Sequence, residues 1–403
     1  MPYSTQRRPG SANRSPRAYQ SRPSTRRPSK SKFSKQYINP SRFVKAAQPA
    51  ADVVEYIPQH AFADFALHPL LKQNIADKGY VTPSPIQDQT ISQGLTGKDI
   101  IGIANTGTGK TAAFMLPTLH RLLEEPHARA LIIAPTRELA QQIEEEARSL
   151  AKGSGLFRAV LIGGSSMGEQ LRDLKSLPSI VIGTPGRIKD HLERGSLDLS
   201  TFNIVTLDEV DRMLDMGFIA DIRFILDSLA HERQSFFFSA TLDPKIRELI
   251  NTFLSDPVVV SVKTGETSDS VEQDVVRYNA SHEKIGKLHD ILTQEHVGKT
   301  LVFDETQRSV ERLAKELQER GFKVDSIHGG KTQGQRTRAL KQFKESKLTV
   351  LVATDVAARG IDVADITHVI NYTTPQTYED YVHRIGRAGR AGRTGYALTF
   401  IDQ

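Results

Sequence analysis

The sequence predicts an α/β protein in which two doubly wound parallel sheets follow one another, preceded by a disordered basic tail. Three observations lead to this class. From about residue 60, short β-rich runs alternate with segments of helical spacing, as in βαβ units. A polar stretch, KTGETSDSVEQ, interrupts the alternation once, and the first 50 residues contain no Asp or Glu. The predicted parts are a tail at 1–58, a first domain at 59–262, a linker at 263–273 and a second domain at 274–403.

The tail concentrates positive charge. Residues 1–50 hold 12 Lys and Arg, which leaves 41 basic and 47 acidic residues in the rest of the chain. Prolines recur throughout, so we expect disorder and not the amphipathic helix of an organellar transit peptide. Aromatic rings among the arginines can stack on bases while guanidinium groups meet phosphates; these are Tyr3, Tyr19, Phe33 and Tyr37. We therefore expect a tail that tethers RNA or recruits ribonucleoprotein partners; the alternative is a solubilising extension.

Composition narrows the class of protein. Apolar residues make up 38% and charged residues 25% of the 403, which fits a soluble α/β protein of two domains. No apolar run reaches 18 residues, and the N-terminus lacks the hydrophobic stretch of a signal peptide, so we expect no membrane contact. The absence of cysteine excludes disulfides, thiolate zinc sites and cysteine nucleophiles. These features suit a cytoplasmic protein, and we expect a monomer.

The predicted strands end in small or polar residues. In the first domain they are DIIGIANTG (99–107), ALIIAPT (130–136), RAVLIGG (158–164), SIVIGTP (179–185), IVTLDE (204–209) and SFFFSAT (235–241), with a helix expected at 138–152. In the second they are TLVFDET (300–306), KVDSIHGG (323–330), TVLVATD (349–355), HVINYTT (368–374) and YALTFI (396–401). Ligands of doubly wound sheets bind at the carboxyl ends of strands. Nearly every motif discussed next lies at such an end.

A phosphate-binding loop follows the first strand. The sequence ANTGTGKT (104–111) lies between a strand and a helix expected from about Ala112, which is the context that such a loop requires. Its residues Thr106, Gly107, Thr108 and Gly109 would surround phosphate oxygens, Lys110 would reach the β- and γ-phosphates, and Thr111 could ligate Mg²⁺. Ala104 stands where the general pattern has its first glycine.

Three carboxylates follow the strand at 204–207. An acidic cluster such as Asp208, Glu209 and Asp211 also fits a solvated loop, but the phosphate loop supplies a reason for it. Mg²⁺ bound to a nucleotide would offset the repulsion between the carboxylates. Asp208 could then hold the metal, and Glu209 could orient or deprotonate the attacking water.

The order of motifs resembles that of the DEAD-box RNA helicases of superfamily 2, across roughly residues 60–403. GYVTPSPIQ (79–87) is similar to the Q motif, and PTRELA (135–140), GG (163–164), TPGR (184–187) and SAT (239–241) match motifs of the first domain. HGG with QGQR (333–336), ATDVAARGID (353–362) and HRIGRAGR (383–390) match the second. The naming tetrapeptide reads DEVD, with Val210 where the family has alanine. The resemblance implies two RecA-like domains that bind ATP and Mg²⁺.

The resemblance also implies residue roles. Gln87 is expected to read the adenine edge, Phe62 to stack on the base and Asp362 to bind the ribose. Arg387 and Arg390 are expected to reach the γ-phosphate. Four residues are expected to couple the ATP site to the rest of the protein: Asp211, Ser239, Thr241 and His383. RNA contacts are expected from Pro135, Thr136, Arg137, Gly163, Gly164, Thr184, Gly186 and Arg187, and in the second domain from Gln333, Arg336 and Thr354.

The function implied is RNA-stimulated ATP hydrolysis coupled to local, non-processive unwinding of short duplexes or remodelling of ribonucleoproteins. Contacts to phosphate and sugar carry no base information, so we expect little sequence specificity. Three alternatives remain open at this point: an ATP-gated RNA clamp with little unwinding, a DNA-directed superfamily 2 translocase, and a small-molecule phosphotransferase. The pathway and the physiological RNA are not specified by the sequence.

Overall fold

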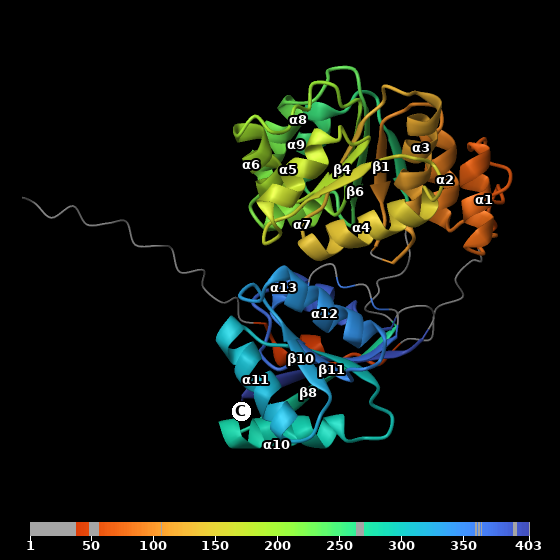
Figure 1. The fold of residues 1–403 in the computed structure, drawn as a ribbon. Coiled ribbons are helices and arrows are strands. Elements are labelled where there is room, and N and C mark those ends of the chain that lie inside the picture. The colour runs from red at the N-terminus through yellow and green to blue at the C-terminus, as the bar shows by residue number, and fades with distance from the viewer. Residues whose placement is uncertain are drawn as a thin grey trace, which may run out of the picture. The chain divides into compact units, whose positions relative to one another are not determined.

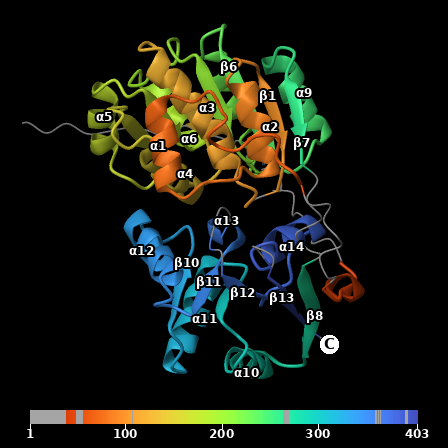
Figure 2. The same ribbon diagram turned by 90° about the vertical axis from the view of Figure 1, so that its right-hand side faces the viewer.

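The computed structural model describes residues 38–47, 56–105, 107–262, 270–358, 361, 363, 365–389 and 393–402. Within these residues the chain builds two parallel sheets with helices packed on their faces (Figures 1 and 2). This confirms the predicted fold class of two doubly wound parallel sheets in tandem. The tail up to residue 37 and the linker residues 263–269 lie outside the described part.

The first sheet has seven strands in the order β3-β4-β2-β5-β6-β1-β7, all parallel to their neighbours. The strands are β1 (Ile100–Ile103), β2 (Ala130–Ile133), β3 (Arg158–Leu161), β4 (Ile180–Gly183), β5 (Ile204–Leu207), β6 (Gln234–Ser239) and β7 (Val258–Ser261). The helices are α1 (Pro69–Asp77), α2 (Pro85–Gly94), α3 (Lys110–Glu124), α4 (Arg137–Leu150), α5 (Met167–Lys175), α6 (Pro185–Glu193), α7 (Val210–Asp215), α8 (Ile219–Asp227) and α9 (Pro244–Phe253).

Two hydrophobic cores cover the two faces of this sheet. Alternate strand residues such as Ile132 and Phe236 pack with α1–α4, whereas their neighbours Leu131 and Phe237 pack with α6–α9. Because side chains alternate between faces, strands buried on both sides become continuous apolar runs. This explains why these strands could be recognised in the sequence. The edge strand β7, which is partly exposed, was not predicted.

The second sheet has six strands in the order β10-β11-β9-β12-β13-β8, again all parallel. The strands are β8 (Val271–Tyr278), β9 (Lys299–Phe303), β10 (Val324–Ile327), β11 (Val350–Ala353), β12 (Ile366–Asn371) and β13 (Gly395–Asp402). The helices are α10 (Ser281–Leu292), α11 (Gln307–Glu319), α12 (Gln333–Lys344), α13 (Asp355–Ala358) and α14 (Tyr378–Ile385).

Two predicted boundaries are corrected. β8 begins at Val271, inside the stretch that was predicted as linker up to residue 273. The reason is that Val271 is fully buried in the core of the second domain. The tail was predicted as disordered to residue 58, yet a short 3-10 helix, η1 (Pro40–Phe43), forms within it and buries Phe43. One aromatic side chain in a polar stretch gives too weak a periodic signal to predict such a contact.

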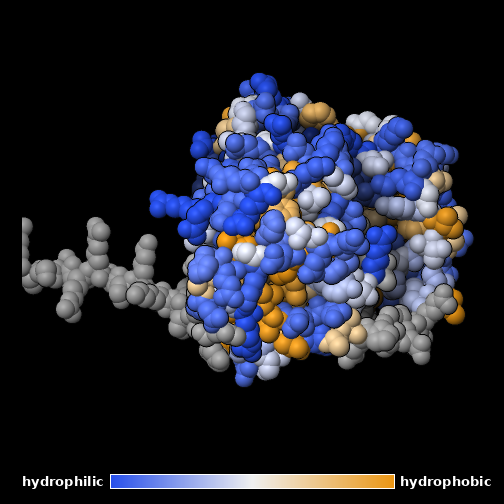
Figure 3. All heavy atoms as spheres, turned by 90° about the horizontal axis from the view of Figure 1, so that it is seen from below, coloured by the Kyte–Doolittle hydropathy of each residue, from blue (hydrophilic) through white to orange (hydrophobic). Residues whose placement is uncertain are grey.

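Hydrophilic residues cover most of the face drawn in Figure 3, and hydrophobic side chains reach the surface in a patch near its centre and at a few scattered places. Across the described ranges, no helix is both long and apolar enough to cross a membrane.

Candidate nucleotide and RNA sites

The strand order divides the motifs of the first sheet into two groups. The phosphate loop, SAT and DEVD follow the adjacent strands β1, β6 and β5, whereas PTRELA, TPGR and GG follow β2, β4 and β3. All lie at carboxyl ends, because every strand of the sheet is parallel. The sheet edge thus offers one half for a nucleotide and another half for a second ligand.

The phosphate loop has the backbone that its glycines permit. Gly107 and Gly109 have φ of +86° and +90°, a region that side chains with a Cβ rarely adopt. Gly109 directly precedes α3, whose first residue is Lys110. The Lys110 Nζ donates to the Ala104 carbonyl at 3.1 Å, so the ammonium lies over the loop. Thr111 follows in the first turn of the helix, and Thr106 lies outside the described residues.

The carboxylates meet Lys110 in a buried setting. Lys110 Nζ lies 4.0 Å from Asp208 Oδ1, and burial raises the pKa of Asp208 to about 6 because Lys110 offsets only part of the desolvation. Burial acts in the same direction on Glu209, but the cations Arg212, Lys110 and Arg387 outweigh it and lower the pKa of Glu209. Arg212 Nη1 donates to Glu209 Oε2 at 2.6 Å. The pair therefore combines Glu209, whose ionised form the nearby cations stabilise, with Asp208, whose ionised form is destabilised by burial.

The backbone at Glu209 is strained. Its φ of 53° and ψ of 54° are left-handed, a conformation that non-glycine residues adopt mainly where the surroundings force it. The turn ends β5 abruptly and starts α7 one residue later, which is what directs Asp208 and Glu209 toward the phosphate loop. Sequence reasoning did not predict this strain or the role of Arg212 as the partner of Glu209.

Hydrogen bonds join the three motifs of this half. Asp211 Oδ2 accepts from the Ala240 backbone N–H at 2.8 Å, which ties DEVD to SAT. The Ala104 N–H donates to the Ser239 carbonyl at 3.1 Å, and the Thr241 N–H donates to Ser239 Oγ at 3.3 Å. Because SAT is hydrogen-bonded to both DEVD and the phosphate loop, a displacement of one motif would change the hydrogen bonds that hold the others.

The Q-motif residues pack on the phosphate loop. Gln87 Nε2 donates to the Gly109 carbonyl at 3.1 Å, and a Cβ at Gly109 would lie only 2.5 Å from that nitrogen. Ser84 Oγ donates to the Thr108 carbonyl at 2.7 Å, and its N–H donates to Gln87 Oε1 at 2.8 Å. Ser84 and Gln87 form the capping box of α2, a pattern that the sequence SPIQ displays and that could have identified Ser84.

Two cavities open onto these residues. One of about 360 Å³ is lined by, among others, Gln87, Gly107, Gly109, Lys110, Thr111, Asp208 and Glu209. The other, of about 550 Å³, is lined by, among others, Phe62, Tyr80, Ser84, Gln87, Gly107, Thr108 and Gly109. The Phe62 and Tyr80 rings are 5.7 Å apart, so two aromatic rings border this second cavity. Tyr80 was not among the predicted residues.

The site has the chemistry of a magnesium ligand set. The Thr111 hydroxyl and the Asp208 carboxylate are the hard oxygen ligands that Mg²⁺ prefers, and both line the same cavity as Lys110. The raised pKa of Asp208 reports buried negative charge that a divalent cation would compensate. These residues therefore fit the metal that the sequence predicts.

On the other half of the sheet edge, Arg137 lies over two glycines, Gly163 and Gly164. A Cβ on Gly164, whose φ is +81°, would lie 2.3 Å from Arg137 Nη1, so only glycine lets this guanidinium lie where it does. The pKa of Arg137 is lowered first by burial and then by Arg336 and Arg187. Cations that are held close enough to disfavour one another's charge form a site for a polyanion.

The remaining predicted residues of this half start two helices. Pro135 and Thr136 end the turn before α4, where Thr136 Oγ1 accepts the Leu139 N–H at 3.2 Å. Thr184 directly precedes α6, and a Cβ on Gly186 would meet nothing within 4 Å. The open space at Gly186 leaves room for close approach of a ligand backbone.

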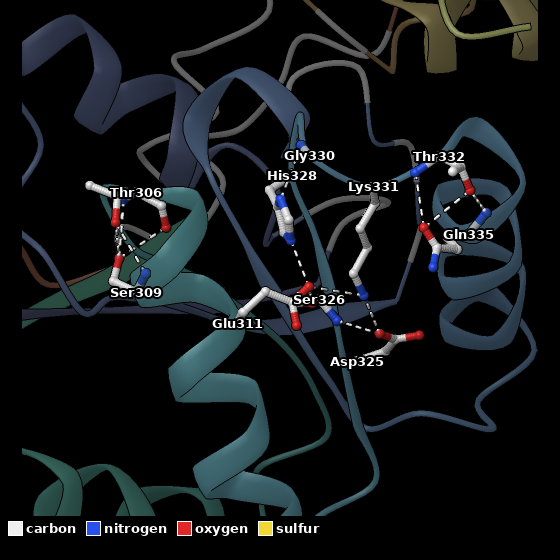
Figure 4. Close-up of polar contacts among 10 residues, drawn as sticks. All are labelled: Thr306, Ser309, Glu311, Asp325, Ser326, His328, Gly330, Lys331, Thr332 and Gln335. Atoms are coloured by element: carbon white, nitrogen blue, oxygen red, sulfur yellow. Dashed lines mark hydrogen bonds and ion pairs between the residues drawn. The ribbon is translucent and has the colours of Figure 1, made fainter.

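In the second domain a polar network holds the turn before α12 (Figure 4). His328 Nε2 and Glu311 Oε1 are 2.6 Å apart, Ser326 Oγ donates to the same carboxylate at 2.9 Å, and Lys331 Nζ pairs with Asp325 at 2.7 Å. This network places Thr332, which caps the helix in a box with Gln335.

The predicted residues of α12 are not exposed. Gln333 and Arg336 are each 6% exposed. Gln333 Nε2 donates to Gln141 Oε1 at 3.0 Å, and Arg336 Nη2 lies 2.7 Å from Glu138 Oε2. Glu138 belongs to PTRELA but was not among the predicted residues. Thr354 follows β11, and its carbonyl accepts the N–H groups of Ala357 and Ala358, the last two residues of α13.

The arginines of HRIGRAGR differ in their surroundings. Arg384, which was not predicted, pairs bidentately with Asp355 at 2.5 and 2.7 Å and anchors α14, the helix that also carries His383. Arg387 is 4% exposed and donates to the Ile361 carbonyl at 3.0 Å. Arg390 and Asp362 lie outside the described residues.

Fold and site together define a two-domain, RecA-like P-loop protein of the helicase class. Residues 84–249 match the family model of the DEAD/DEAH box helicases, and residues 283–392 match that of the helicase conserved C-terminal domain. The chain belongs to the DEAD/DEAH box helicase family, as the order of motifs in the sequence had indicated.

The names of similar proteins agree with this family assignment. The ATP-dependent RNA helicase CshA of Listeria monocytogenes is 45% identical over 342 residues, which cover 84% of this chain and 66% of that protein. The DEAD-box ATP-dependent RNA helicase CshA of Bacillus subtilis is 45% identical over 84% of this chain and 69% of its own length. The chain thus spans about two thirds of these relatives. The structure of S. cerevisiae Dbp5 bound to RNA and ADP BeF3 aligns with a TM-score of 0.74 at 28% identity, over 85% of this chain and 90% of that chain.

Proposed function

We propose that this protein is an ATP-dependent RNA helicase that hydrolyses ATP in response to RNA and unwinds or remodels short RNA duplexes and ribonucleoproteins locally and non-processively. One observation carries the proposal: Lys110, Asp208 and Glu209 line a single cavity with the phosphate loop and Gln87. Arg137, which lies against Gly163 and Gly164, belongs to the other half of the same sheet edge. The names of the bacterial relatives and the RNA-bound yeast structure support the same activity.

In this proposal the nucleotide half performs the chemistry. Lys110 binds the β- and γ-phosphates with the phosphate-loop backbone, while Phe62 and Gln87 hold the adenine. Thr111 and Asp208 hold Mg²⁺, which when bound would supply neutralisation of phosphate charge. Glu209, whose lowered pKa keeps it ionised at neutral pH, orients the attacking water and accepts its proton at the carboxylate.

The second domain, whose first strand β8 begins at Val271, completes the site. Arg387 and Arg390 stabilise the charge that develops on the γ-phosphate, and Asp362 binds the ribose. ATP hydrolysis is linked to RNA binding by four residues of the two domains, Asp211, Ser239, Thr241 and His383. The electrostatic effect of Arg387 on Glu209 supports the assignment.

RNA is proposed to lie over the PTRELA, GG and TPGR half of the first domain and over Gln333, Arg336 and Thr354 of the second. Arg336 pairs with Glu138 and Gln333 with Gln141, and RNA phosphates are proposed to compete with these carboxylate and amide oxygens as acceptors. We further propose that the protein works as a monomer in the cytoplasm, with the basic tail recruiting RNA or ribonucleoproteins.

The test compares ATP turnover without nucleic acid, with single-stranded RNA and with single-stranded DNA of the same sequence. We expect single-stranded RNA, but not DNA, to stimulate ATP turnover. We also expect the protein to displace a strand from a short RNA duplex. Glu209→Gln should lower turnover by about 10²-fold or more while ATP-dependent RNA retention persists. Equal stimulation by DNA would identify a DNA-directed translocase, and RNA retention without turnover in the parent protein would identify a clamp.

A further inference from the structure

Residues 38–47 precede the first domain in the sequence but pack on the second sheet. Phe43 is 1% exposed and belongs to the same core as Val271 and Ala397. Figure 2 shows η1, drawn in red, beside β8, and residues of the two elements are in contact. Asn39 caps η1 through a hydrogen bond from the Ser41 N–H at 3.1 Å. The segment has its own local structure at the point of contact.

A backbone contact covers one position of a sheet edge. The second sheet ends at β8, whose free side would present unpaired N–H and C=O groups. The Lys45 N–H donates to the Gln273 carbonyl at 3.0 Å, and the Gln273 N–H donates to the Lys45 carbonyl at 2.8 Å. This antiparallel pair is the beginning of strand addition, a common way for an extended segment to bind a sheet.

Side chains add specificity to the backbone pair. The Phe43 ring lies 4.7 Å from the Tyr381 ring, and the Arg42 guanidinium carbon lies 3.6 Å from the centre of the Tyr378 ring. Tyr381 Oη donates to Gln273 Oε1 at 2.9 Å, so the aromatic contact and the edge contact share a residue. Both tyrosines belong to α14, the helix that carries His383 and leads to Arg387.

The chain is fixed again a few residues later, on the first domain. Asp88 is 2% exposed and accepts hydrogen bonds from Tyr56 Oη at 2.6 Å and from the Gln59 N–H at 2.7 Å, with His60 Nδ1 at 2.7 Å. Residues 48–55 therefore join two anchored points, and this stretch can extend at most about 30 Å.

We propose that the edge of β8 and the tyrosine face of α14 form a docking site for residues 38–47, which we call the clasp. The clasp makes an N-terminal segment part of the second domain and gives the two domains a second covalent connection beside the linker. The inference rests on these contacts and does not depend on ATP hydrolysis.

Hydrogen exchange of the full chain tests the contact. Peptides that cover 38–47 and 271–278 should exchange slowly in the parent protein, because Lys45 and Gln273 protect each other's amides. Phe43→Ala should speed exchange in both peptides by about 10-fold or more, and Arg42→Ala by less. The matched control is Val44→Ala, because Val44 is 53% exposed, and it should leave exchange unchanged. Fast exchange of 38–47 in the parent, or no effect of Phe43→Ala, would overturn the proposal.

A peptide in solution tests the docking site itself. A labelled peptide of residues 38–47 should bind the full-length Phe43→Ala variant but not the parent, because a tethered segment competes at an effective concentration in the millimolar range. The same peptide carrying Phe43→Ala should bind neither. Equal binding to parent and variant, or binding to neither, contradicts an occupied docking site.

Discussion

At position 210 a valine stands between Glu209 and Asp211, where the family motif has alanine. Its side chain is fully buried and belongs to the core that includes Met213 and Leu249. The two additional methyl groups therefore fill space under α7, the helix that starts directly after the strained Glu209. The departure from the family concerns packing, because the carboxylates on either side of it remain in contact with Arg212 and Ala240.

Val210→Ala should accordingly affect stability more than turnover. Removal of two buried methyl groups should lower the free energy of unfolding by about 1–2 kcal/mol. RNA-stimulated ATP turnover should stay within a few-fold of the parent, because neither Asp208 nor Glu209 loses a partner. Urea unfolding and phosphate release measure the two effects. Val259→Ala, at a position 56% exposed, serves as the control that should change neither; loss of turnover in Val210→Ala would show that the valine couples the site.

At the scale of elements, α2 contacts both the phosphate loop and the segment 56–60. Its N-terminus holds Ser84 and Gln87 against the phosphate loop, and its Asp88 holds the segment 56–60 that leads to Phe62. Burial alone would raise the pKa of Asp88, but the donors Tyr56, Gln59 and His60 lower it. The carboxylate therefore stays ionised while it orders the segment that leads to Phe62.

Asp88→Ala should release that segment. We expect a several-fold higher KM for ATP with a nearly unchanged kcat, because the role proposed for Phe62 is to bind the base and not to take part in the chemistry. Asp88→Asn keeps one acceptor oxygen and should fall between the parent and Asp88→Ala. Steady-state kinetics at saturating RNA provides the measurement, and an equal loss in kcat would instead indicate a general disturbance of the phosphate loop.

The strand β12 makes the second domain sensitive to acid. Burial lowers the pKa of His368 to about 4, and the nearby His296 contributes in the same direction. The His368 ring stacks on Tyr396 at 4.9 Å and contacts Thr367 Oγ1 through Nδ1 at 2.9 Å. Because the unfolded chain takes up this proton near pH 6.5 and the folded chain does not, stability is full above that pH and falls as the pH drops toward 4.

His368→Phe should remove this dependence while keeping the stack on Tyr396. Between pH 7 and pH 5 the parent should lose about 1–2 kcal/mol more of its free energy of unfolding than the variant. Urea unfolding at both pH values, followed through the hydrogen exchange of β12, measures the difference. Equal losses in the two proteins would assign the acid sensitivity to other groups.

At the scale of the whole molecule, the basic tail and the clasp can be separated. Residues 1–37 carry ten Lys and Arg, whereas the contacts of the clasp begin at Asn39. Deletion of residues 1–37 should therefore lower RNA affinity by about 10-fold or more at low salt and reduce the salt dependence of binding, because fewer counterions are released. ATP turnover without RNA should not change.

Binding to single-stranded RNA at several salt concentrations measures this effect. Phe43→Ala in the full chain is the complementary control, because it should disturb the clasp and leave the ten cations in place. An unchanged salt slope after the deletion would assign the tail to solubility instead.

The sequence by itself determined the two-sheet fold, the order of motifs and the residues Lys110, Asp208 and Glu209. Buried parallel strands become apolar runs, and loops that bind phosphate need particular residues at fixed spacing, so both leave local patterns. Only the tertiary structure decided that Arg212 pairs with Glu209, that Arg137 lies across Gly164 and that Asp88 anchors Tyr56. It also decided that Phe43 packs on Tyr381, far along the chain. Apart from the local Arg212–Glu209 pair, these contacts join segments with no shared periodicity, and their free energy depends on which side chains the folded backbone brings within a few ångströms.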